Sequence, residues 1–327
     1  MKTRLFGNTG RKVSEVGLGC WQLGGTEWGD VPDDQALAIL GAAVDSGVTF
    51  FDTADVYGNG RSESLIGRFL KRSAKEIFVA TKLGRMADLY PDNYTEPGVR
   101  AAIEASLARL GIETIDLIQL HCIPMEVMRQ GDIFEWLRKL QEEGKVRSFG
   151  ASVESVDEAL LCLEQKGFAS LQIIFNIFRQ KPIGALFPQA KKKGVAIIVR
   201  LPLASGLLSG KLTKDTKFGV KDHRFFNRDG KQFNVGETFA GIPFEKGVEL
   251  AEEMKAFVPE GLSMVQLAQR WILDYDAVSV IIPGASSAAQ ARENARVSDL
   301  PALSRSLHDR LENYYQSEVE PFIRGPY

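Results

Sequence analysis

Cysteine is scarce in this sequence, and its scarcity argues against two kinds of architecture. The 327 residues include three cysteines, Cys20, Cys122 and Cys162, which are scattered and odd in number. Such usage fits a reducing compartment better than a disulfide framework. The spacing of the cysteines and histidines resembles no zinc site, so we expect no bound metal. These features predict a cytoplasmic protein without disulfides.

The sequence also lacks an excess of one charge and any long apolar run. Lysine and arginine total 40 against 42 aspartate and glutamate residues, which gives a net charge of -2. A nucleic-acid binder would carry a basic excess, and a membrane helix would need about 18 consecutive apolar residues. Residues 1–5 lack the apolar segment of a secretory signal. We therefore expect neither a nucleic acid nor a membrane as a partner.

Short apolar runs alternate with amphipathic stretches along the whole chain. The runs are apolar nearly throughout, which is typical of parallel strands that are covered on both faces. The eight predicted strands are Val16–Cys20, Val48–Asp52, Ile77–Lys82, Ile115–His121, Val146–Gly150, Leu171–Phe175, Val195–Arg200 and Val278–Pro283.

The stretches between these runs are predicted helices. Apolar side chains fall on one stripe in residues 97–110 and 155–166, and Gly111 and Gly167 stand where left-handed C-caps are expected. Eight such units predict an α/β fold, a (β/α)8 TIM barrel that residues 1–327 form as a single domain. An open, doubly wound sheet stays as the alternative, because a count of units does not exclude it. Other helices are expected to end at Gly47, Gly144 and Gly194.

Two segments fall outside the repeat. Residues 2–15 contain the turn sequence Asn8-Thr9-Gly10 and predict a hairpin that closes the bottom of the barrel. Residues 211–243 form a long insertion after the seventh strand, rich in glycine, lysine and phenylalanine. Loops of this length are usually functional lids or disordered segments.

Four titratable side chains stand at the ends of three consecutive predicted strands. Asp52 ends the second strand and Tyr57 follows it, Lys82 ends the third, and His121 ends the fourth. Taken singly, each has an ordinary interpretation as a cap, a solvated charge or a hydrogen-bonded core histidine. Because active sites of such barrels lie at the C-terminal ends of the strands, the four together predict a catalytic centre.

The segments that carry these residues resemble those of the aldo-keto reductase family, in the same order and spacing. They are FFDTADVYGNGRSESLIGRFL (50–70), VATKLG (79–84), IDLIQLHC (115–122) and LPLASGLLSGKL (201–212). The resemblance places that family's Asp-Tyr-Lys-His tetrad on Asp52, Tyr57, Lys82 and His121. It implies an NAD(P)-dependent oxidoreductase that moves a hydride between a nicotinamide cofactor and a carbonyl or alcohol.

Physical chemistry supports these roles. An unperturbed phenol has a pKa of about 10, and a neighbouring ammonium such as that of Lys82 is expected to lower the pKa of Tyr57. Asp52 would hold Lys82 in place, and His121 would orient the carbonyl oxygen. Tyr57 would then protonate that oxygen as hydride reaches the carbon, and act in reverse during oxidation.

The first strand carries no dinucleotide-binding fingerprint, because Gly17-Leu18-Gly19 is followed by Cys20-Trp21 and not by a glycine that opens a helix. The resemblance instead implies that the nicotinamide lies across the barrel mouth, with Ser152 and Gln172 at its carboxamide. Val153 stands where the family often has asparagine. The other positions that the resemblance assigns to the cofactor are Gly19, Leu203, Gly206, Leu208, Lys211, Gly284, Ser286, Gln290 and Asn294.

Two departures from the family pattern concern this cofactor. Arg200 replaces an aromatic residue that stacks on the ring, and three interpretations are open: stacking by the guanidinium, pairing with a substrate carboxylate, or a structural ion pair. NADP-preferring relatives usually carry a cation at the places of Gly284, Ser286 and Gln290, whereas the only cation of this segment is Arg292, one turn into the predicted helix. The cofactor is therefore NADP(H) or NAD(H), with NAD(H) expected to be used at least as well. Ser287 and Gln290 are alternatively a simple capping box.

The predicted substrate is a small carbonyl, alcohol or sugar-like molecule. Candidate pocket walls are Trp21, Trp28 and Tyr90, with the phenylalanines of residues 211–243 and the tail after residue 318. Two other functions stay open: a cofactor-sensing subunit resembling potassium-channel β subunits, and a non-redox barrel lyase or isomerase. The sequence names neither the substrate, the direction of the reaction nor the oligomeric state.

Overall fold

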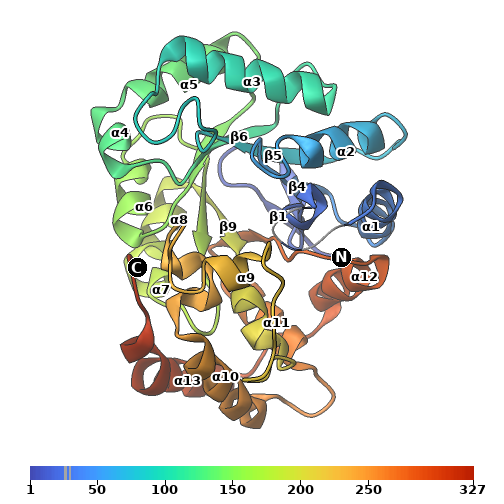
Figure 1. Ribbon diagram of the computed structural model, residues 1–327, viewed down its shortest axis with the longest axis vertical. Helices are drawn as coiled ribbons and strands as arrows, with labels where there is room; N and C mark the ends of the chain where they lie inside the picture. Colours follow the sequence, from blue (N-terminus) through green and yellow to red (C-terminus); the bar gives the residue numbers. More distant parts are fainter. Residues whose placement is uncertain (26–27, 29–30) are drawn as a thin grey trace.

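The computed structural model describes residues 1–25, 28 and 31–327, and its core is a barrel of eight parallel strands (Figure 1). Each strand pairs with the next along the chain. The first and last strands meet through bridges at Val16–Ile281 and Gly19–Gly284, and the Gly17 N–H donates to the Ile281 carbonyl at 2.8 Å. The predicted barrel is thus confirmed, and the open sheet is excluded. The strands are β3 (Leu18–Gly19), β4 (Phe50–Asp52), β5 (Phe78–Leu83), β6 (Leu117–His121), β7 (Phe149–Ser152), β8 (Ser170–Ile174), β9 (Ala196–Arg200) and β10 (Val278–Ile281).

Most of these strands are shorter than the apolar runs that predicted them, and β7 is displaced by more than one residue. The fifth run was expected over Val146–Gly150, whereas β7 spans Phe149–Ser152, and Val146 forms only an isolated bridge to Ile115. Apolar character reports burial, which begins before the regular ladder does. The strand then continues into Ser152, which is polar but small and buried.

An antiparallel hairpin closes the bottom of the barrel, as predicted. It consists of β1 (Thr3–Leu5) and β2 (Lys12–Ser14). Phe6 and Val13 are fully buried and join the cluster inside the barrel, where Phe6 packs on Phe50 and Phe78 with ring centroids 5.6 and 5.0 Å apart. The lower interior is therefore a solid apolar plug, which leaves the upper end for polar groups.

Helices surround the strands and bury their apolar faces against them (Figure 1). Thr95 caps α3, and Gly111 ends it with a φ of 65°, as the sequence predicts. The helix expected over 155–166 begins at Val156, directly after its cap Ser155, and ends at Leu163, three residues earlier than expected. None of the described helices combines the length and apolar character that a membrane span needs. The helices are α1 (Asp33–Asp45), α2 (Arg61–Leu70), α3 (Glu96–Leu110), α4 (Met125–Gln130), α5 (Asp132–Glu142), α6 (Val156–Leu163), α7 (Pro182–Ala185), α8 (Phe187–Lys193), α9 (His223–Phe226), α10 (Phe244–Glu253), α11 (Met264–Leu273), α12 (Ala288–Arg296) and α13 (Arg305–Tyr314).

The long insertion at 211–243 is folded and not merely irregular. It contains α9 and two short 3-10 turns, η3 (Val235–Glu237) and η4 (Phe239–Gly241). Buried aromatic contacts anchor it, among them Phe239 against Phe244 at 4.9 Å between ring centroids. Phe233 and Glu237 reach the cavity at the barrel mouth. The insertion thus supplies one wall of that cavity.

Alternation along the strands places polar side chains above the apolar plug. Residues two apart on a strand point to the same side, so Phe50 and Asp52 of β4 both face the barrel interior. The same holds for Ala80 and Lys82 of β5. The charged side chains at the carboxyl ends of the strands therefore lie close together at the upper end of the barrel interior.

Candidate active site

A buried lysine links three of the strand-end groups. Lys82 Nζ donates to Asp52 Oδ1 at 2.6 Å, to the Thr53 carbonyl at 2.8 Å and to Tyr57 Oη at 3.1 Å. Lys82 and Asp52 are almost completely buried, at 0% and 2% exposure. Because an ammonium has three donors, these contacts satisfy Lys82 fully and fix the direction of the Tyr57 hydroxyl.

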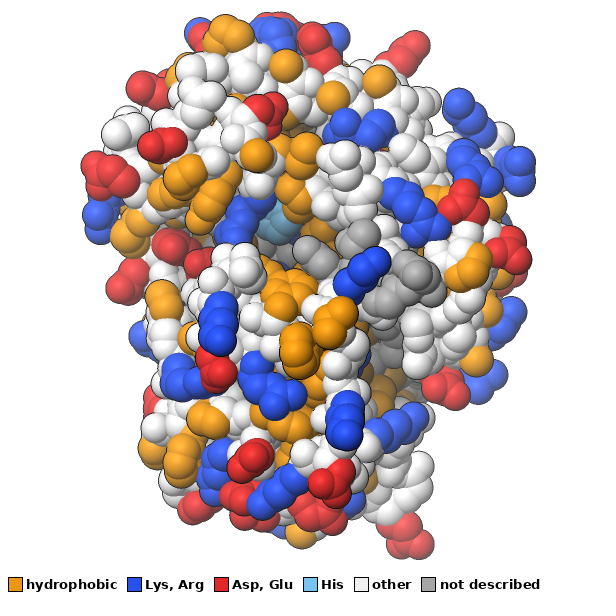
Figure 2. Space-filling model, in the orientation of Figure 1, with side chains coloured by type: hydrophobic (Ala, Val, Ile, Leu, Met, Phe, Trp, Pro, Cys, Tyr) orange, Lys and Arg blue, Asp and Glu red, His pale blue; other side chains and the backbone are white. Residues whose placement is uncertain are grey.

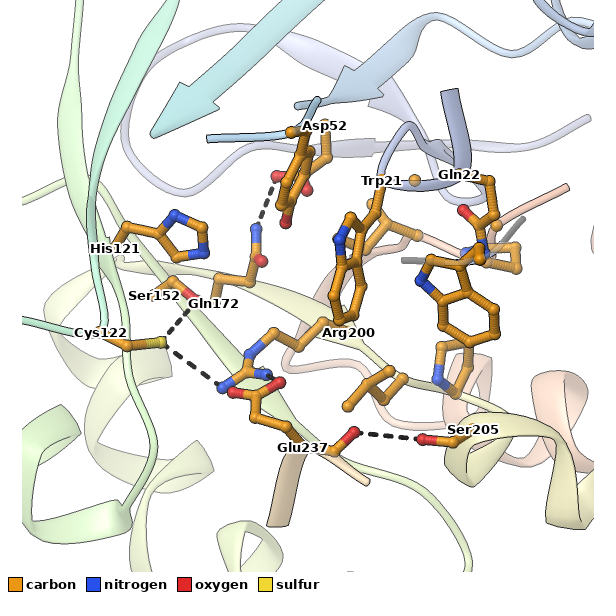
Figure 3. Close-up of a pocket in the computed structure, with 18 of the residues that line it drawn as sticks. Trp21, Gln22, Asp52, His121, Cys122, Ser152, Gln172, Arg200, Ser205 and Glu237 are labelled. Carbon is orange, nitrogen blue, oxygen red and sulfur yellow. Dashed lines mark hydrogen bonds and ion pairs between the residues drawn. The ribbon is translucent and has the colours of Figure 1, made fainter. Parts of the chain in front are cut away.

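Two glutamines hold the other oxygen of Asp52. Gln172 Nε2 donates to Asp52 Oδ2 at 2.7 Å (Figure 3). Gln119 Nε2 donates to the same oxygen at 3.2 Å. Gln172 was predicted at the cofactor carboxamide, and here its Nε2 is bound to Asp52. Sequence reasoning missed Gln119, although it lies two residues before His121 and therefore on the same face of β6. Asp52 is a fixed anchor with both oxygens engaged.

Two glycines allow the Tyr57 loop to approach the loop after β3. A β-carbon on Gly58, whose φ is 61°, would lie 2.2 Å from the Gly24 carbonyl oxygen, and one on Gly24 would lie 2.7 Å from the Gly58 nitrogen. The close contact brings Trp21 parallel to the Tyr57 ring, with centroids 5.8 Å apart and planes 20° apart. The phenol is thereby held by packing as well as by Lys82.

His121 completes the group from the end of β6. Its ring meets the Tyr57 ring edge to face, with centroids 5.8 Å apart. Its Nδ1 is buried and has no hydrogen-bond partner among the described residues. Burial, together with the charges of Lys82, Arg85 and Arg200, lowers the pKa of His121 well below its usual value. The imidazole is therefore neutral at physiological pH and offers one N–H to a ligand.

The pKa of Tyr57 departs from the expectation that Lys82 lowers it. Burial of the phenol raises its pKa to about 12, and the opposing effect of the Lys82 charge is smaller. Burial also opposes the charge on Lys82, but Asp52 and Tyr57 outweigh it, so the pKa of Lys82 is raised. The proton thus stays on Tyr57 and Lys82 stays charged.

Asp52, Tyr57 and His121 line a cavity of about 300 Å³ at the barrel mouth, and Lys82 lies behind them. Figure 2 shows the hollow in the middle of this face, with basic and hydrophobic side chains around it. Trp21, Trp28 and Phe233 form its aromatic side, and Trp28 meets Trp21 edge to face at 5.6 Å. A deep pocket with apolar walls and a few polar groups is typical of a small-molecule site.

Not every candidate pocket residue lies on this cavity. Tyr90 is 38% exposed, packs against the Arg85 guanidinium at 4.9 Å and does not line the cavity. Phe225 is 52% exposed, and Phe218 packs with Phe239 and is absent from the walls. The tail after residue 318 also lies outside them. Aromatic composition alone does not separate pocket walls from packing.

Comparison with known proteins identifies the family. A family model described as the aldo/keto reductase family matches residues 15–316. The chain belongs to that family. It is 30% identical to L-galactose dehydrogenase of Arabidopsis thaliana over 337 residues, covering 99% of this chain and 94% of that protein. It is 28% identical to aldo-keto reductase YhdN of Bacillus subtilis (strain 168) over 341 residues, covering 100% and 98%.

A solved structure agrees with this assignment. The glycerol dehydrogenase AKR11B4 from Gluconobacter oxydans superimposes with a TM-score of 0.79 at 29% identity, covering 99% of this chain and 98% of that chain. The protein is thus an NAD(P)-dependent aldo/keto reductase, an oxidoreductase that acts on carbonyl or alcohol substrates.

Some of the predicted cofactor-binding residues of this aldo/keto reductase line the cavity, and others do not. Leu208 is buried in the core, and its N–H donates to the Leu203 carbonyl. Lys211 is exposed and does not reach the cavity. Ser286, Gln290 and Asn294 also lie beyond its walls. Those that line it are Gly19, Ser152, Gln172, Arg200, Leu203, Gly206 and Gly284.

The segment after β9 turns sharply beside the cavity. Ala204, Ser205 and Gly206 have φ values of 48°, 55° and 101°. Positive φ at residues other than glycine is unfavourable, and such strain gathers at functional sites. The Ala204 and Gly206 N–H groups donate to the Leu201 and Leu203 carbonyls at 3.0 and 2.9 Å, which holds the turn in this shape. The buried Nδ1 of His121 and Nε of Arg200, both unpartnered among the described residues, are groups that a bound cofactor or substrate would satisfy.

The turn after β10 is held by hydrogen bonds to side chains of α12. Gln290 Oε1 accepts from the Ser286 N–H at 2.8 Å and from Ser286 Oγ at 2.9 Å. Ser287 caps α12 by accepting from the Gln290 N–H at 3.2 Å, so the capping box is present in half. Asn294 donates to the Gly284 carbonyl at 3.1 Å. This turn is built from neutral groups.

Arg200 forms an ion pair with a residue that the sequence did not indicate. Its Nη1 pairs with Glu237 of η3, and its Nη2 donates to the Val153 carbonyl at 2.9 Å. Of the three interpretations left open by the sequence, the structure shows the internal ion pair. Glu237 lies in an irregular loop, where no periodicity marks a functional side chain.

Proposed function

We propose that Tyr57 is the acid and base in the interconversion of a carbonyl compound and an alcohol. The observation that carries the proposal is the shared Lys82 ammonium, which binds Asp52 Oδ1 at 2.6 Å and Tyr57 Oη at 3.1 Å at the edge of the cavity. A charge placed beside a phenol stabilises the phenolate at the moment the proton leaves. Asp52 keeps Lys82 protonated and in position.

Tyr57 and His121 have different roles in this reaction. The nicotinamide cofactor supplies or accepts the hydride when bound. Tyr57 holds the proton that passes to the carbonyl oxygen during reduction and takes it back during oxidation. His121, neutral and with a free nitrogen, orients that oxygen. Together the two side chains polarise the carbonyl as an oxyanion hole does.

The substrate that these walls favour is a small carbonyl or alcohol, including a sugar-like ring. Trp21 and Trp28 offer apolar faces, whereas Arg85 and Glu154, which lie 3.6 Å apart, offer polar groups near the same cavity. Such a combination suits molecules with both hydroxyl groups and C–H faces.

A panel of aldehydes, ketones and aldoses tests the reaction. We expect loss of the absorbance of the reduced cofactor with at least one carbonyl compound and its gain with the matching alcohol. Tight cofactor binding without any turnover across the panel would favour a sensor. Conversion of substrate without net change of cofactor would favour a lyase or isomerase.

We further propose that NAD(H) is used at least as well as NADP(H). The support is the turn at 284–290, which carries no lysine or arginine and whose Ser286 is covered by Gln290. Phosphate groups are usually held by charge-assisted hydrogen bonds.

Fluorescence titration with both reduced cofactors measures this preference. NADH should bind at least as tightly as NADPH. A Gln290→Arg variant places a cation at this exposed position and should tighten NADPH binding while leaving NADH unchanged. Clearly tighter NADPH binding by the unaltered protein would contradict the proposal.

A further inference from the structure

The ion pair between Arg200 and Glu237 sits on the wall of the cavity that holds the catalytic groups. Arg200 is 7% exposed at the end of β9, and Glu237 comes from η3 of the insertion. Besides the carboxylate, the guanidinium contacts the Val153 carbonyl at 2.9 Å and Cys122 Sγ at 3.8 Å. Arg200 therefore spans from its own strand to the ends of β7 and β6 (Figure 3).

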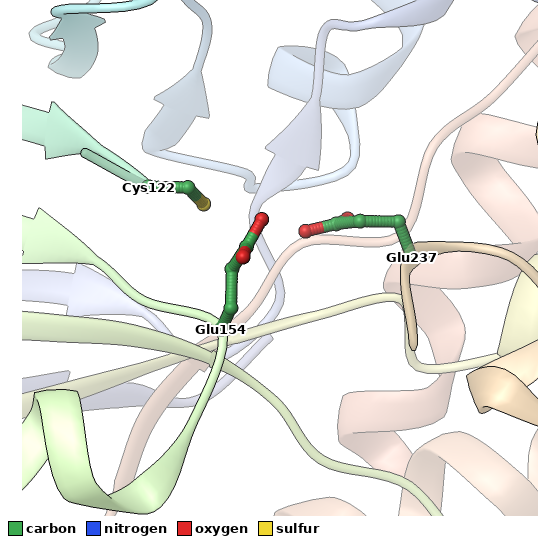
Figure 4. Close-up of side chains that lie close together, drawn as sticks. All are labelled: Cys122, Glu154 and Glu237. Atoms are coloured by element: carbon green, nitrogen blue, oxygen red, sulfur yellow. The ribbon is translucent and has the colours of Figure 1, made fainter. Parts of the chain in front are cut away.

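A second pair lies beside it. Glu154 pairs with Arg85 at 3.6 Å and accepts from Asn234 Nδ2 at 3.2 Å. Ligand atoms of Cys122, Glu154 and Glu237 all lie within 4.8 Å of one another (Figure 4). Both carboxylates already have a guanidinium partner. This wall is thus a balanced set of two positive and two negative charges.

Glu237 stabilises the charge on Arg200, and the backbone of Glu237 is itself held in place. Burial opposes the charge on Arg200, but Glu237 outweighs it and raises the pKa of Arg200. The backbone of Glu237 is held as well, because Ser205 Oγ donates to its carbonyl at 3.1 Å. Arg200 is therefore held from β9, and Glu237 is held both by η3 and by Ser205.

A nicotinamide ring in this cavity would lie in the field of that pair. The hydride must reach a carbon whose oxygen contacts Tyr57, so the ring has to share the cavity of about 300 Å³ that Arg200 and Glu237 line. The ring is positively charged when oxidised and neutral when reduced. Charges in a buried site interact more strongly than in water. An unbalanced charge on this wall would therefore change the binding of one form more than that of the other.

We propose that Arg200 and Glu237 act in opposite directions on the relative affinity of the protein for the oxidised and the reduced cofactor, and that their pairing keeps either charge from shifting this ratio. The inference rests on the proposed function, because it requires a nicotinamide in this cavity. Arg200 disfavours the oxidised ring, and Glu237 compensates. Both residues act as positioning and electrostatic groups around the cofactor and exchange no proton with the substrate.

Whether a variant raises or lowers the ratio of the two Kd values depends on which charge remains on the cavity wall. A Glu237→Gln variant leaves Arg200 uncompensated and should raise the ratio of the Kd of the oxidised cofactor to that of the reduced cofactor about tenfold. An Arg200→Met variant leaves Glu237 uncompensated and should lower the same ratio about tenfold. The double variant restores neutrality and should return the ratio to within about threefold of the starting value.

Equilibrium titrations of the full-length protein with NAD⁺ and NADH, and with the phosphorylated pair, measure this ratio without any turnover. Glu164→Gln is the matched control, because Glu164 pairs with Lys193 at 2.7 Å on the surface and is absent from the cavity wall. Circular dichroism of each variant shows whether it is folded. If Arg200→Met does not fold, Glu237→Gln decides alone, since its amide still accepts a hydrogen bond from Arg200.

The outcomes separate the two proposals. A higher ratio in Glu237→Gln, with no change in Glu164→Gln, supports the inference. Binding of both cofactor forms with an unaltered or lowered ratio in Glu237→Gln overturns it while leaving the proposed function intact. Failure of the unaltered protein to bind either form overturns both.

Discussion

Replacing Tyr57 with phenylalanine should lower kcat about 10³-fold, because the reaction loses the group that donates and accepts the proton. The phenyl ring retains the contacts with Trp21 and His121, so the cavity keeps its shape. The Kd of the reduced cofactor should change less than about threefold, since the lost hydroxyl contributes to proton transfer and not to the cofactor site.

Tyr90→Phe is the matched control for this loss. It removes the same hydroxyl from a tyrosine that is 38% exposed and lies away from the cavity. Its kcat should equal that of the unaltered protein. If Tyr57→Phe kept more than about a tenth of the activity, Tyr57 would not be the proton donor.

Replacing Lys82 with methionine should damage both stability and activity. The change leaves the Asp52 carboxylate buried at 2% exposure without its cation. Loss of one partner of a buried ion pair costs about 3–5 kcal/mol of unfolding free energy. The kcat should fall at least about 10²-fold, because nothing then stabilises the developing phenolate.

A double variant separates these two effects. In Asp52→Asn with Lys82→Met the buried charge is gone, so urea denaturation should recover most of the lost unfolding free energy. The activity should not recover, because Tyr57 still lacks its cationic neighbour. A double variant that regained activity would show that Lys82 serves the fold alone, and a single variant as stable as the unaltered protein would contradict the buried pair.

The barrel was predictable because its strands are covered on both faces. Continuous apolar runs such as Val278–Pro283 mark such strands, and β10 was found within this one. The first and last residues of each strand were less predictable, because hydrophobicity indicates burial, whereas hydrogen bonding between strands defines where a strand begins and ends. The fifth strand shows the difference, because Val146 is buried yet lies outside β7.

The candidate site was predictable where chemistry coincides with periodicity. Asp52, Lys82 and His121 end consecutive strands, and the structure brings them together around Tyr57 as the sequence predicted. Glu237 was not predictable, because its position depends on the folding of a long insertion.

The direction of the pKa shift of Tyr57 could not be predicted from the sequence, because two opposing effects act on it. Lys82 does favour the phenolate of Tyr57, but burial outweighs it and raises the pKa to about 12. The sign could be known only after the exposure of the ring was known. Arg200 is a similar case, since its partner lies 37 residues further along the chain.

Transfer of a deuterium label shows whether hydride passes directly from the cofactor to the carbonyl carbon and whether Tyr57 is needed for it. Reduced cofactor in which both hydrogens on the hydride-donating carbon are deuterium is mixed with the protein and the best carbonyl substrate, and the alcohol is analysed by mass spectrometry. We expect one deuterium on the carbinol carbon of each product molecule, with product formation about 10³-fold slower in Tyr57→Phe. Product without deuterium, or undiminished label transfer in Tyr57→Phe, would contradict this expectation.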